Sequence, residues 1–243
     1  GFSILDREDQ KELLATVITA AGIDPKKDRF PKAEVVGDMI SYTINSGATL
    51  EDVLEARYPY FAQHAEKLEK IAAKYLDKKR ATNSMDFDDL LVQAAAILRD
   101  NPELRENYRK RFKFILVDEF QDTNAVQAEF VDLLVGEGTS LMVVGDDAQS
   151  IYSWRGADCE NILGFPQRYP GAAVFTIDTN YRSVPEVLAL ANASIACNTR
   201  QFPKNLAAAR PPLDEIPALV PVDDPRMQAA FVAERILELY DEG

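Results

Sequence analysis

The sequence predicts an α/β protein in which a helical region precedes a parallel sheet, and three observations support this class. Apolar side chains in residues 1–111 recur at the three-to-four-residue spacing of amphipathic helices. From residue 112 onward, short continuous apolar runs alternate with a helical pattern, which is typical of buried parallel strands. Each run ends in polar or acidic residues, and parallel sheets bind their ligands at the carboxyl ends of their strands.

The region 1–111 is predicted to consist of several helices. Stripes of apolar residues on one helix face run through 6–21, 60–76 and 86–98. Pro25 and Pro59 separate these stripes, because proline disrupts a helix interior. Between 35 and 60 no clear pattern indicates a structure or a role.

Three strands are predicted to follow. The apolar runs that indicate them span 112–117, 141–144 and 174–177. A helical stretch at 126–134 lies between the first two runs. This order of strand, helix and strand favours a parallel sheet, because parallel neighbours need a crossover connection.

The C-terminal part is predicted to hold two helices and an irregular connection. The first helix spans about 184–198, with Pro185 in its first turn. The segment 203–225 contains six prolines and therefore cannot form one continuous helix. The last helix is predicted at 225–240.

Composition sets limits on the class of protein. The 243 residues are 47% hydrophobic and 28% charged, which is ordinary for a globular chain. No apolar run reaches the roughly 18 residues of a membrane span, and no signal-peptide pattern opens the chain. Cys159 and Cys197 show neither metal-ligand spacing nor a disulfide framework, which predicts free thiols in a reducing cytoplasm.

The net charge of −13 argues at first against a nucleic-acid partner. The charge is uneven, however, because acids concentrate in 211–243 while basic residues cluster in 67–80 and 105–113. Basic runs of this kind are commonly solvated helix faces. The overall charge therefore leaves the partner open.

The first motif with chemical potential is the acid pair Asp118-Glu119, which follows an apolar run. A carboxylate at a strand end suits Mg²⁺, a hard cation that prefers oxygen ligands, and Asp118 is the candidate ligand. Glu119 is then the candidate for orienting and deprotonating an attacking water. The alternative is a strand end that carries two solvated acids.

The second motif, residues 143–158, again follows an apolar run. Gln149 can sense a terminal phosphate, because an amide both donates and accepts hydrogen bonds. Tyr152, Trp154 and Arg155 offer two ring faces and a planar cation, which suit base stacking and phosphate pairing with a single strand. The alternative for Trp154, the only tryptophan, is a position in the core.

The third motif is Asn180-Tyr181-Arg182-Ser183, which follows the third apolar run. An arginine at a domain junction can neutralise the charge that develops on a transferred phosphoryl group. Arg182 is therefore a candidate arginine finger.

Three blocks in this order resemble motifs II, III and IV of superfamily 1 DNA helicases of the UvrD/Rep/PcrA group. They are VDEFQDTN at 117–124, VGDDAQSIYSWRGAD at 144–158 and NYRS at 180–183. The run SIYSWRGAD is more similar to Rep and UvrD than to the RecB and AddA nuclease-helicases. Weaker similarity to the group extends to 2–6, 86–91 and 231–239.

The resemblance implies a fold as well as an activity. The implied fold is a partial RecA-like P-loop NTPase with a parallel sheet, a large all-α insertion of the 1B type and the beginning of a second motor domain. We expect the helical insertion at 1–111, part of the first motor domain (1A) at 112–179 and the start of the second (2A) at 180–243.

The resemblance also implies ATP and Mg²⁺ as cofactors, with roles for individual residues. At the nucleotide, Asp118 would ligate Mg²⁺, Glu119 would activate water and Gln149 would contact the γ-phosphate. Tyr181 would stack on adenine, and Arg182 would reach the γ-phosphate from the second motor domain. The residues implied to contact single-stranded DNA are Tyr152, Trp154 and Arg155.

The implied function is ATP-driven 3′-to-5′ translocation on single-stranded DNA, with unwinding at junctions of single and double strand. No glycine is followed by lysine, so the sequence lacks the phosphate-binding loop that such a motor needs. We therefore expect a fragment that is inactive as an ATPase by itself. We also expect self-association, because a sheet without its phosphate-loop strand exposes an edge and an apolar face.

Two alternatives stay open at this point. The first alternative is a non-catalytic module that binds single-stranded DNA, and the second is part of a RecB/AddA-like helicase-nuclease. The sequence does not indicate whether the parent protein serves DNA repair, replication restart or plasmid replication.

Overall fold

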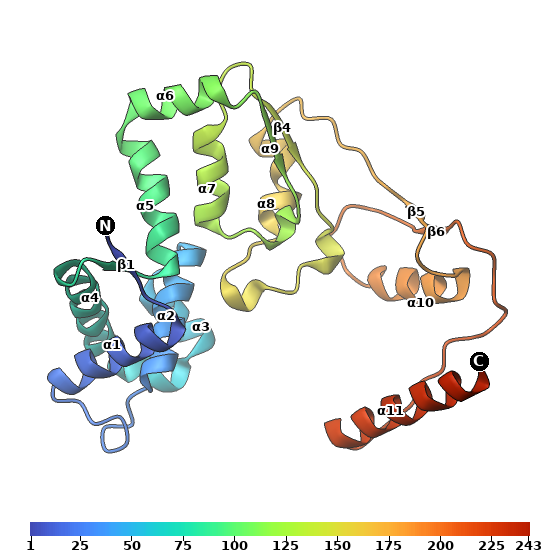
Figure 1. Ribbon diagram of the computed structural model, residues 1–243, viewed down its shortest axis with the longest axis horizontal. Helices are drawn as coiled ribbons and strands as arrows, with labels where there is room; N and C mark the ends of the chain where they lie inside the picture. Colours follow the sequence, from blue (N-terminus) through green and yellow to red (C-terminus); the bar gives the residue numbers. More distant parts are fainter. The chain divides into compact units, whose positions relative to one another are not determined.

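The computed structural model describes residues 1–243 and divides into two units, Gly1–Val174 and Phe175–Gly243, each of which is described by itself. Helices predominate, and all three sheets are two-stranded and parallel (Figure 1). The predicted mixed α/β class is therefore confirmed. No helix combines the length and the apolar character that a membrane crossing requires.

The N-terminal part of the first unit is helical, as predicted. Its elements are β1 (Ser3–Ile4), α1 (Arg7–Ala20), α2 (Ala33–Ser46), α3 (Leu50–Arg57), the 3-10 helix η1 (Pro59–His64), α4 (Ala65–Ala81), β2 (Ser84–Met85), α5 (Phe87–Asp100) and α6 (Pro102–Arg111). Asp6 and Asp86 begin α1 and α5 through reciprocal capping boxes, which satisfy backbone N–H groups that a helix start leaves unpaired. The sequence pattern did not predict α2 and α3.

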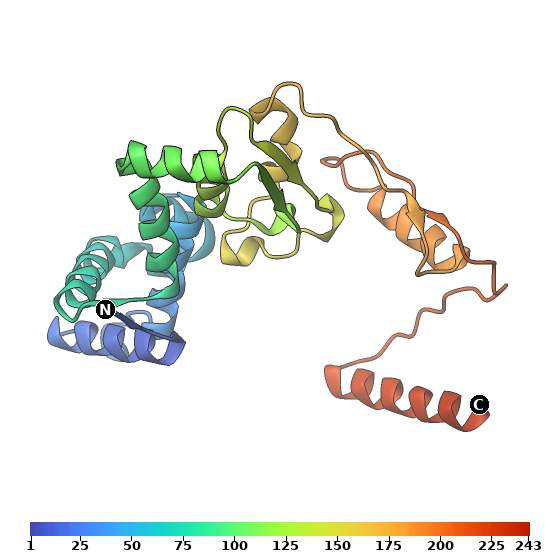
Figure 2. The same cartoon turned by 45° about the horizontal axis from the view of Figure 1, so that its top comes forward.

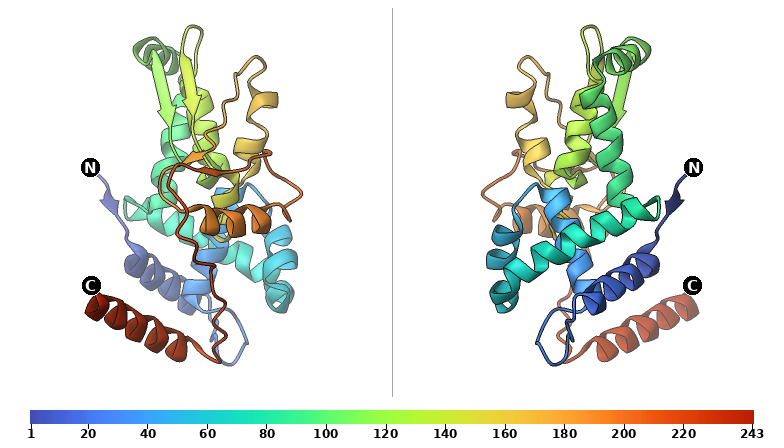
Figure 3. Two further views of the ribbon diagram at one scale, coloured as in Figure 1. Left: turned by 90° about the vertical axis from the view of Figure 1, so that its right-hand side faces the viewer. Right: turned by 90° about the vertical axis from the view of Figure 1, so that its left-hand side faces the viewer.

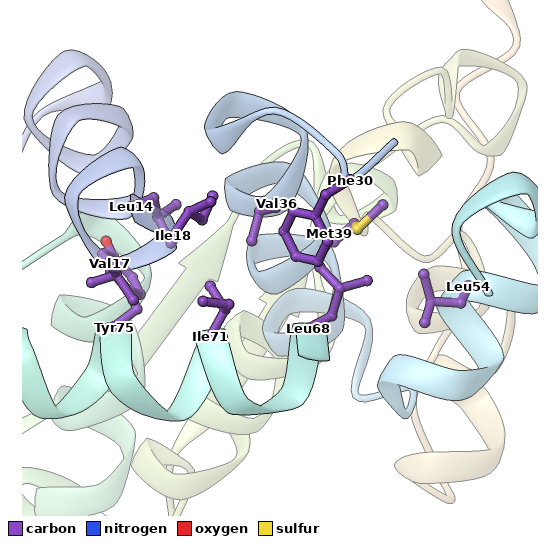
Figure 4. Close-up of a cluster of buried hydrophobic side chains, with 10 residues drawn as sticks. All are labelled: Leu14, Val17, Ile18, Phe30, Val36, Met39, Leu54, Leu68, Ile71 and Tyr75. Carbon is purple, nitrogen blue, oxygen red and sulfur yellow. The ribbon is translucent and has the colours of Figure 1, made fainter. Parts of the chain in front are cut away.

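The core of this helical part is formed by apolar faces of α1 to α4. Figure 4 shows the side chains that converge there: Leu14, Val17, Ile18, Phe30, Val36, Met39, Leu54, Leu68, Ile71 and Tyr75. All are buried, and burying a side chain of this size contributes about 1.5–3 kcal/mol. The four helices are thus stabilised by packing on one another.

A buried ion cluster joins α4 to the start of α5. Lys79 is only 3% exposed, and its Nζ lies 2.7 Å from Oδ2 of Asp86 and 2.5 Å from Oδ2 of Asp89. The Tyr75 hydroxyl donates to the same Asp86 oxygen at 2.8 Å. Burial alone would raise the pKa of Asp86, but the hydrogen bonds from Lys79, from the Asp89 backbone and from Tyr75, together with the charge of Lys79, outweigh it and hold that pKa below its usual value.

The second part of the unit is built on strands β3 (Phe114–Val117) and β4 (Ser140–Val143), with helix α7 (Ala125–Leu134) between them in the chain. The strands lie side by side and pair in parallel with Val117 opposite Val143 (Figure 3). This confirms two of the three predicted strands. Helix α7 packs along α5, and α6 contacts both helices (Figure 2).

One face of this small sheet is uncovered. Side chains alternate across a strand, so every second residue points to the same side. The apolar residues on the open face are Phe114, Leu116, Met142 and Val144, which are all exposed. The residues on the other face are half-buried, and beyond the strand end the short helix α8 (Glu160–Leu163) contacts the 3-10 helix Phe120–Asp122. There the ring of Phe120 meets Phe165, on the short helix α9 (Phe165–Arg168), edge-on at 5.8 Å.

The second unit contains β5 (Thr179–Asn180), α10 (Pro185–Ile195), β6 (Ala207–Ala208) and α11 (Pro225–Glu242). Both predicted C-terminal helices are confirmed, and the proline-rich connection contains no helix. The predicted strand at 174–177 is wrong, because its backbone meets no neighbouring strand. Val174, Phe175 and Ile177 are instead largely exposed, and β5 with β6 forms the sheet that follows.

Candidate functional site

The ends of β3 and β4 lie next to each other because the two strands run parallel and in register. The backbone N–H of Val144 donates to the carbonyl of Val117 at 2.8 Å, and the N–H of Phe120 donates to the carbonyl of Val144 at 2.9 Å. The acid pair Asp118-Glu119 therefore lies beside the loop that begins at Gly145. Both predicted nucleotide motifs share this edge of the sheet.

Glu119 has an unusual backbone, with φ of 51° in the left-handed region. Such a conformation in a residue other than glycine costs on the order of 1–3 kcal/mol and is held by its surroundings. One local hydrogen bond supports it, since Oδ1 of Asp118 accepts the backbone N–H of Glu119 at 2.9 Å. The turn leaves both carboxyl side chains exposed at the strand end.

The buried side chain of Gln121 connects the two loops. Its Nε2 donates to Oε2 of Glu119 at 2.8 Å, and its Oε1 accepts the backbone N–H of Asp146 at 3.0 Å. The loop after β4 comes so close that a Cβ on Gly145 would lie 2.4 Å from Oε1 of Gln121. Position 145 therefore requires glycine, because any side chain there would collide with Gln121.

Gln149 belongs to the same network. Its Nε2 donates to Oδ2 of Asp146 at 2.8 Å, and Oδ1 of Asp146 accepts the backbone N–H of Ala148 at 3.0 Å. A chain of hydrogen bonds thus runs from Glu119 through Gln121 and Asp146 to Gln149. Sequence reasoning missed the two central members, although an amide two residues after the acid pair was a visible signal.

The acids at this edge influence one another. Burial raises the pKa of Asp122, and the nearby charge of Glu119 raises it further. Desolvation and the like charge of Glu119 both disfavour the ionised form of Asp122, because carboxylates that lie close together repel one another. A cation is the natural partner for such a strand end.

The residues present fit a magnesium ion. Mg²⁺ keeps several waters and is usually held by one or two carboxylates together with substrate phosphates. Asp118 supplies one exposed carboxylate of this kind. No group of three or more acidic, histidine or cysteine side chains suited to a metal occurs in residues 1–243, and a magnesium–nucleotide site does not need one.

The predicted DNA-contacting residues follow Gln149 on a surface turn. Trp154 is 52% exposed and lies in the 3-10 helix η4 (Ser153–Arg155), so the alternative of a core position is wrong. The guanidinium of Arg155 lies 4.5 Å from the Trp154 ring and 5.0 Å from the Tyr152 ring. The two aromatic faces and the cation are thus held as one exposed group.

The helical part of the unit supports this turn. Gly156 has φ of 88°, and a Cβ there would lie 2.8 Å from Cβ of Asn45 on α2. Oδ1 of Asn45 accepts the side-chain amide of Asn124 at 2.7 Å, and its Nδ2 donates to Oδ1 of Asp88 at 2.9 Å. A single buried asparagine therefore joins α2, α5 and the segment after the acid pair.

Tyr181 and Arg182 lie in the second unit. Oδ1 of Asn180 accepts the backbone N–H groups of Arg182 at 2.9 Å and Ser183 at 2.7 Å, which forms a tight polar turn. Arg210 donates to the carbonyl of Arg182 at 3.0 Å. Both predicted side chains are exposed on this turn, while the other six predicted site residues lie in the first unit.

Comparison with known proteins gives consistent matches. The UvrD/REP helicase N-terminal domain family matches residues 1–170. The chain is 36% identical, over all 243 residues, to the ATP-dependent DNA helicase PcrA of Bacillus subtilis (strain 168) and covers 32% of that protein. The PcrA proteins of Staphylococcus epidermidis (strain RP62A) and Staphylococcus aureus (strain Mu50) are 36% and 35% identical over the same length. The chain spans about a third of the length of these curated relatives.

Proposed function

Because the chain belongs to the UvrD/Rep helicase family, we propose that it is a segment of an ATP-dependent DNA helicase that moves 3′ to 5′ along single-stranded DNA and unwinds duplex at junctions. The observation that carries this proposal is the hydrogen-bond chain from Glu119 to Gln149, because Gln149 lies only five residues before the exposed Trp154. It links a nucleotide-type strand end to a base-stacking surface within one unit.

We assign the nucleotide chemistry to the end of β3. Asp118 would hold Mg²⁺, which offsets the negative charge of the nucleotide phosphates when it is bound. The Glu119 carboxylate would take a proton from the attacking water. Its hydrogen bond from Gln121 and its left-handed backbone orient that carboxylate in advance.

Gln149 would read the state of the nucleotide. Its Nε2 now donates to Asp146, and a γ-phosphate offers a competing acceptor of higher charge. Exchanging one acceptor for the other would shift the loop that leads to Trp154 only five residues on. This is the proposed coupling between hydrolysis and the grip on DNA.

The remaining assignments are proposals of the same kind. The parallel pair β3–β4 would belong to a RecA-like motor domain, the helices α1 to α6 to its helical insertion, and the second unit to the start of another motor domain. Tyr181 would stack on adenine and Arg182 would reach the γ-phosphate. A cytoplasmic location accords with these roles.

Two measurements test the proposal. Titration of the chain with oligothymidylate should quench the emission of Trp154, the only tryptophan, and the substitution Arg155→Gln should weaken binding.

The second measurement is of ATPase activity, and the chain alone should release no phosphate from ATP. A longer chain that includes a Gly-Lys-Thr phosphate loop should hydrolyse ATP, and Glu119→Gln in that chain should abolish turnover while nucleotide binding persists. Robust phosphate release by residues 1–243 alone contradicts the assignment.

A second candidate function concerns the isolated chain. The exposure of Trp154 and its stacking with Arg155 favour a module that binds single-stranded DNA without turnover. Two results together would favour this alternative over the motor. DNA binding by residues 1–243 would be unaffected by Asp118→Asn, and a longer chain would show no ATPase activity.

A further inference from the structure

The side chain of Arg57, at the end of α3, reaches the turn that carries the proposed DNA-contacting residues. Its Nη1 lies 3.5 Å from the backbone carbonyl of Trp154, at the long end of a hydrogen bond. The same guanidinium lies 4.1 Å from the centre of the Tyr42 ring on α2. Arg57 is therefore held between an aromatic face of the helical part and the backbone beneath the indole.

This environment prepares the guanidinium for an anion. Stacking on Tyr42 fixes the plane of the group, so little side-chain entropy remains to be lost on binding. A guanidinium has five N–H donors, and the contact with the Trp154 carbonyl uses one. Arg57 is exposed and forms no ion pair with a carboxylate of the chain.

Arg155 forms no ion pair in the structure either, and its cation stacks on Trp154 and Tyr152. Two cations without acidic partners thus contact the residue that carries the exposed indole, Arg155 at its ring and Arg57 at its backbone, in a chain whose net charge is −13. Other exposed arginines of the first unit differ, since Arg7, Arg80, Arg99 and Arg168 each pair with an acid. Uncompensated positive charge beside an exposed ring is the arrangement that single-stranded nucleic acid requires.

We propose that Arg57 is a further contact for a backbone phosphate of single-stranded DNA, extending the proposed binding surface from the turn Tyr152–Arg155 onto α3 and α2. The inference rests on the proposed function of that turn. The helical part would then hold the strand directly. Stacking at Trp154 and phosphate binding at Arg57 would anchor one nucleotide unit from two sides.

The salt dependence of binding tests this proposal, because a phosphate contact releases counterions and a purely structural contact does not. For single strands the slope of log K against log salt changes by about 0.7 for each phosphate neutralised. The probe is fluorescein-labelled oligothymidylate, followed by anisotropy with the full 243-residue chain. Arg57→Gln should weaken binding and reduce the slope by about 0.7, and Arg57→Lys should restore most of the slope because it keeps the charge. Arg7→Gln, which removes an arginine on α1 that is paired with Asp38, should change neither.

Three outcomes separate the two proposals. If Arg57→Gln leaves the slope unchanged while Arg155→Gln reduces it, the assignment of Arg57 is overturned and the turn keeps its role. If affinity falls equally in Arg57→Gln and Arg57→Lys without any change in slope, Arg57 only supports the Trp154 backbone, and the assignment is again overturned. If the unsubstituted chain shows no binding at low salt, the proposed function of the turn itself fails. Circular dichroism of each variant identifies any loss of folding.

Discussion

Gln121 accepts the backbone N–H of Asp146 at 3.0 Å, and this bond fixes the loop after β4 against the loop after β3. The two residues are 25 positions apart in the chain, so the contact exists only because β3 and β4 are parallel neighbours. The amide donates to Glu119 at the same time. One buried side chain therefore aligns Glu119 with the loop that carries Gln149.

Replacing this amide should destabilise the first unit. Gln121→Ala removes a buried amide and leaves the part-buried Asp146 N–H without this acceptor, which costs about 1–3 kcal/mol. Urea unfolding followed by tryptophan emission measures the loss. Gln63→Ala, at an exposed position, should change the unfolding free energy by less than about 0.5 kcal/mol. Equal effects of the two substitutions would show that the bridge contributes nothing.

The buried lysine on α4 should be far more sensitive than its exposed neighbour. Lys79→Met removes the cation that faces Asp86 and Asp89, and breaking a buried pair in this way costs about 3–5 kcal/mol. Arg80→Met, one residue along the same helix and mostly exposed, should cost little. Thermal unfolding of both variants gives the comparison. A stable Lys79→Met variant would mean that the acids are neutral in the folded chain.

The stability of the helical part should fall in acid. The folded-state pKa of Asp86 lies below its unfolded value of about 3.9, so the stabilisation is present above that value and is lost as pH falls through the folded pKa. Asp86→Asn removes this titration. The unfolding free energy, measured from pH 6 down to acid conditions, should therefore drop less steeply for the variant than for the unsubstituted chain. Parallel curves would contradict the prediction.

The uncovered face of the β3–β4 sheet should cause self-association. Phe114 and Leu116 are 74% and 72% exposed on one side of β3, and contiguous exposed apolar surface promotes contacts between molecules. Light scattering should give a mass that rises with concentration, and Phe114→Ser with Leu116→Ser should lower it. The control pair Phe175→Ser and Ile177→Ser is as exposed but lies outside any sheet. A monomer at every concentration would refute this prediction.

Local patterns in the sequence were sufficient for much of the fold. Apolar stripes and strand-length runs predicted α1, α4, α5, α10 and α11 together with β3 and β4, because helix and strand periodicity are properties of neighbouring residues. They failed at α2 and α3, which are defined by packing against α1 and α4. They also failed at 174–177, because a strand needs a partner that no local pattern supplies.

The sequence by itself determined which residues are candidates for the site. The acid pair Asp118-Glu119, Gln149 and the Tyr152–Arg155 turn were all identified as candidates from residue type and order, and their roles stay proposals. Side-chain chemistry belongs to each residue wherever it lies. Motifs can therefore be recognised from the sequence alone.

Only the tertiary structure decided how these residues are connected. The Gln121 bridge, the Asn45 contact with Asn124 and the contact of Arg57 with the Trp154 carbonyl all join residues that are far apart in the chain. Such contacts depend on the parallel register of two strands and on the packing of α2 and α3 beside the turn. Their geometry is set by the burial of apolar faces elsewhere in the unit, which no single motif encodes.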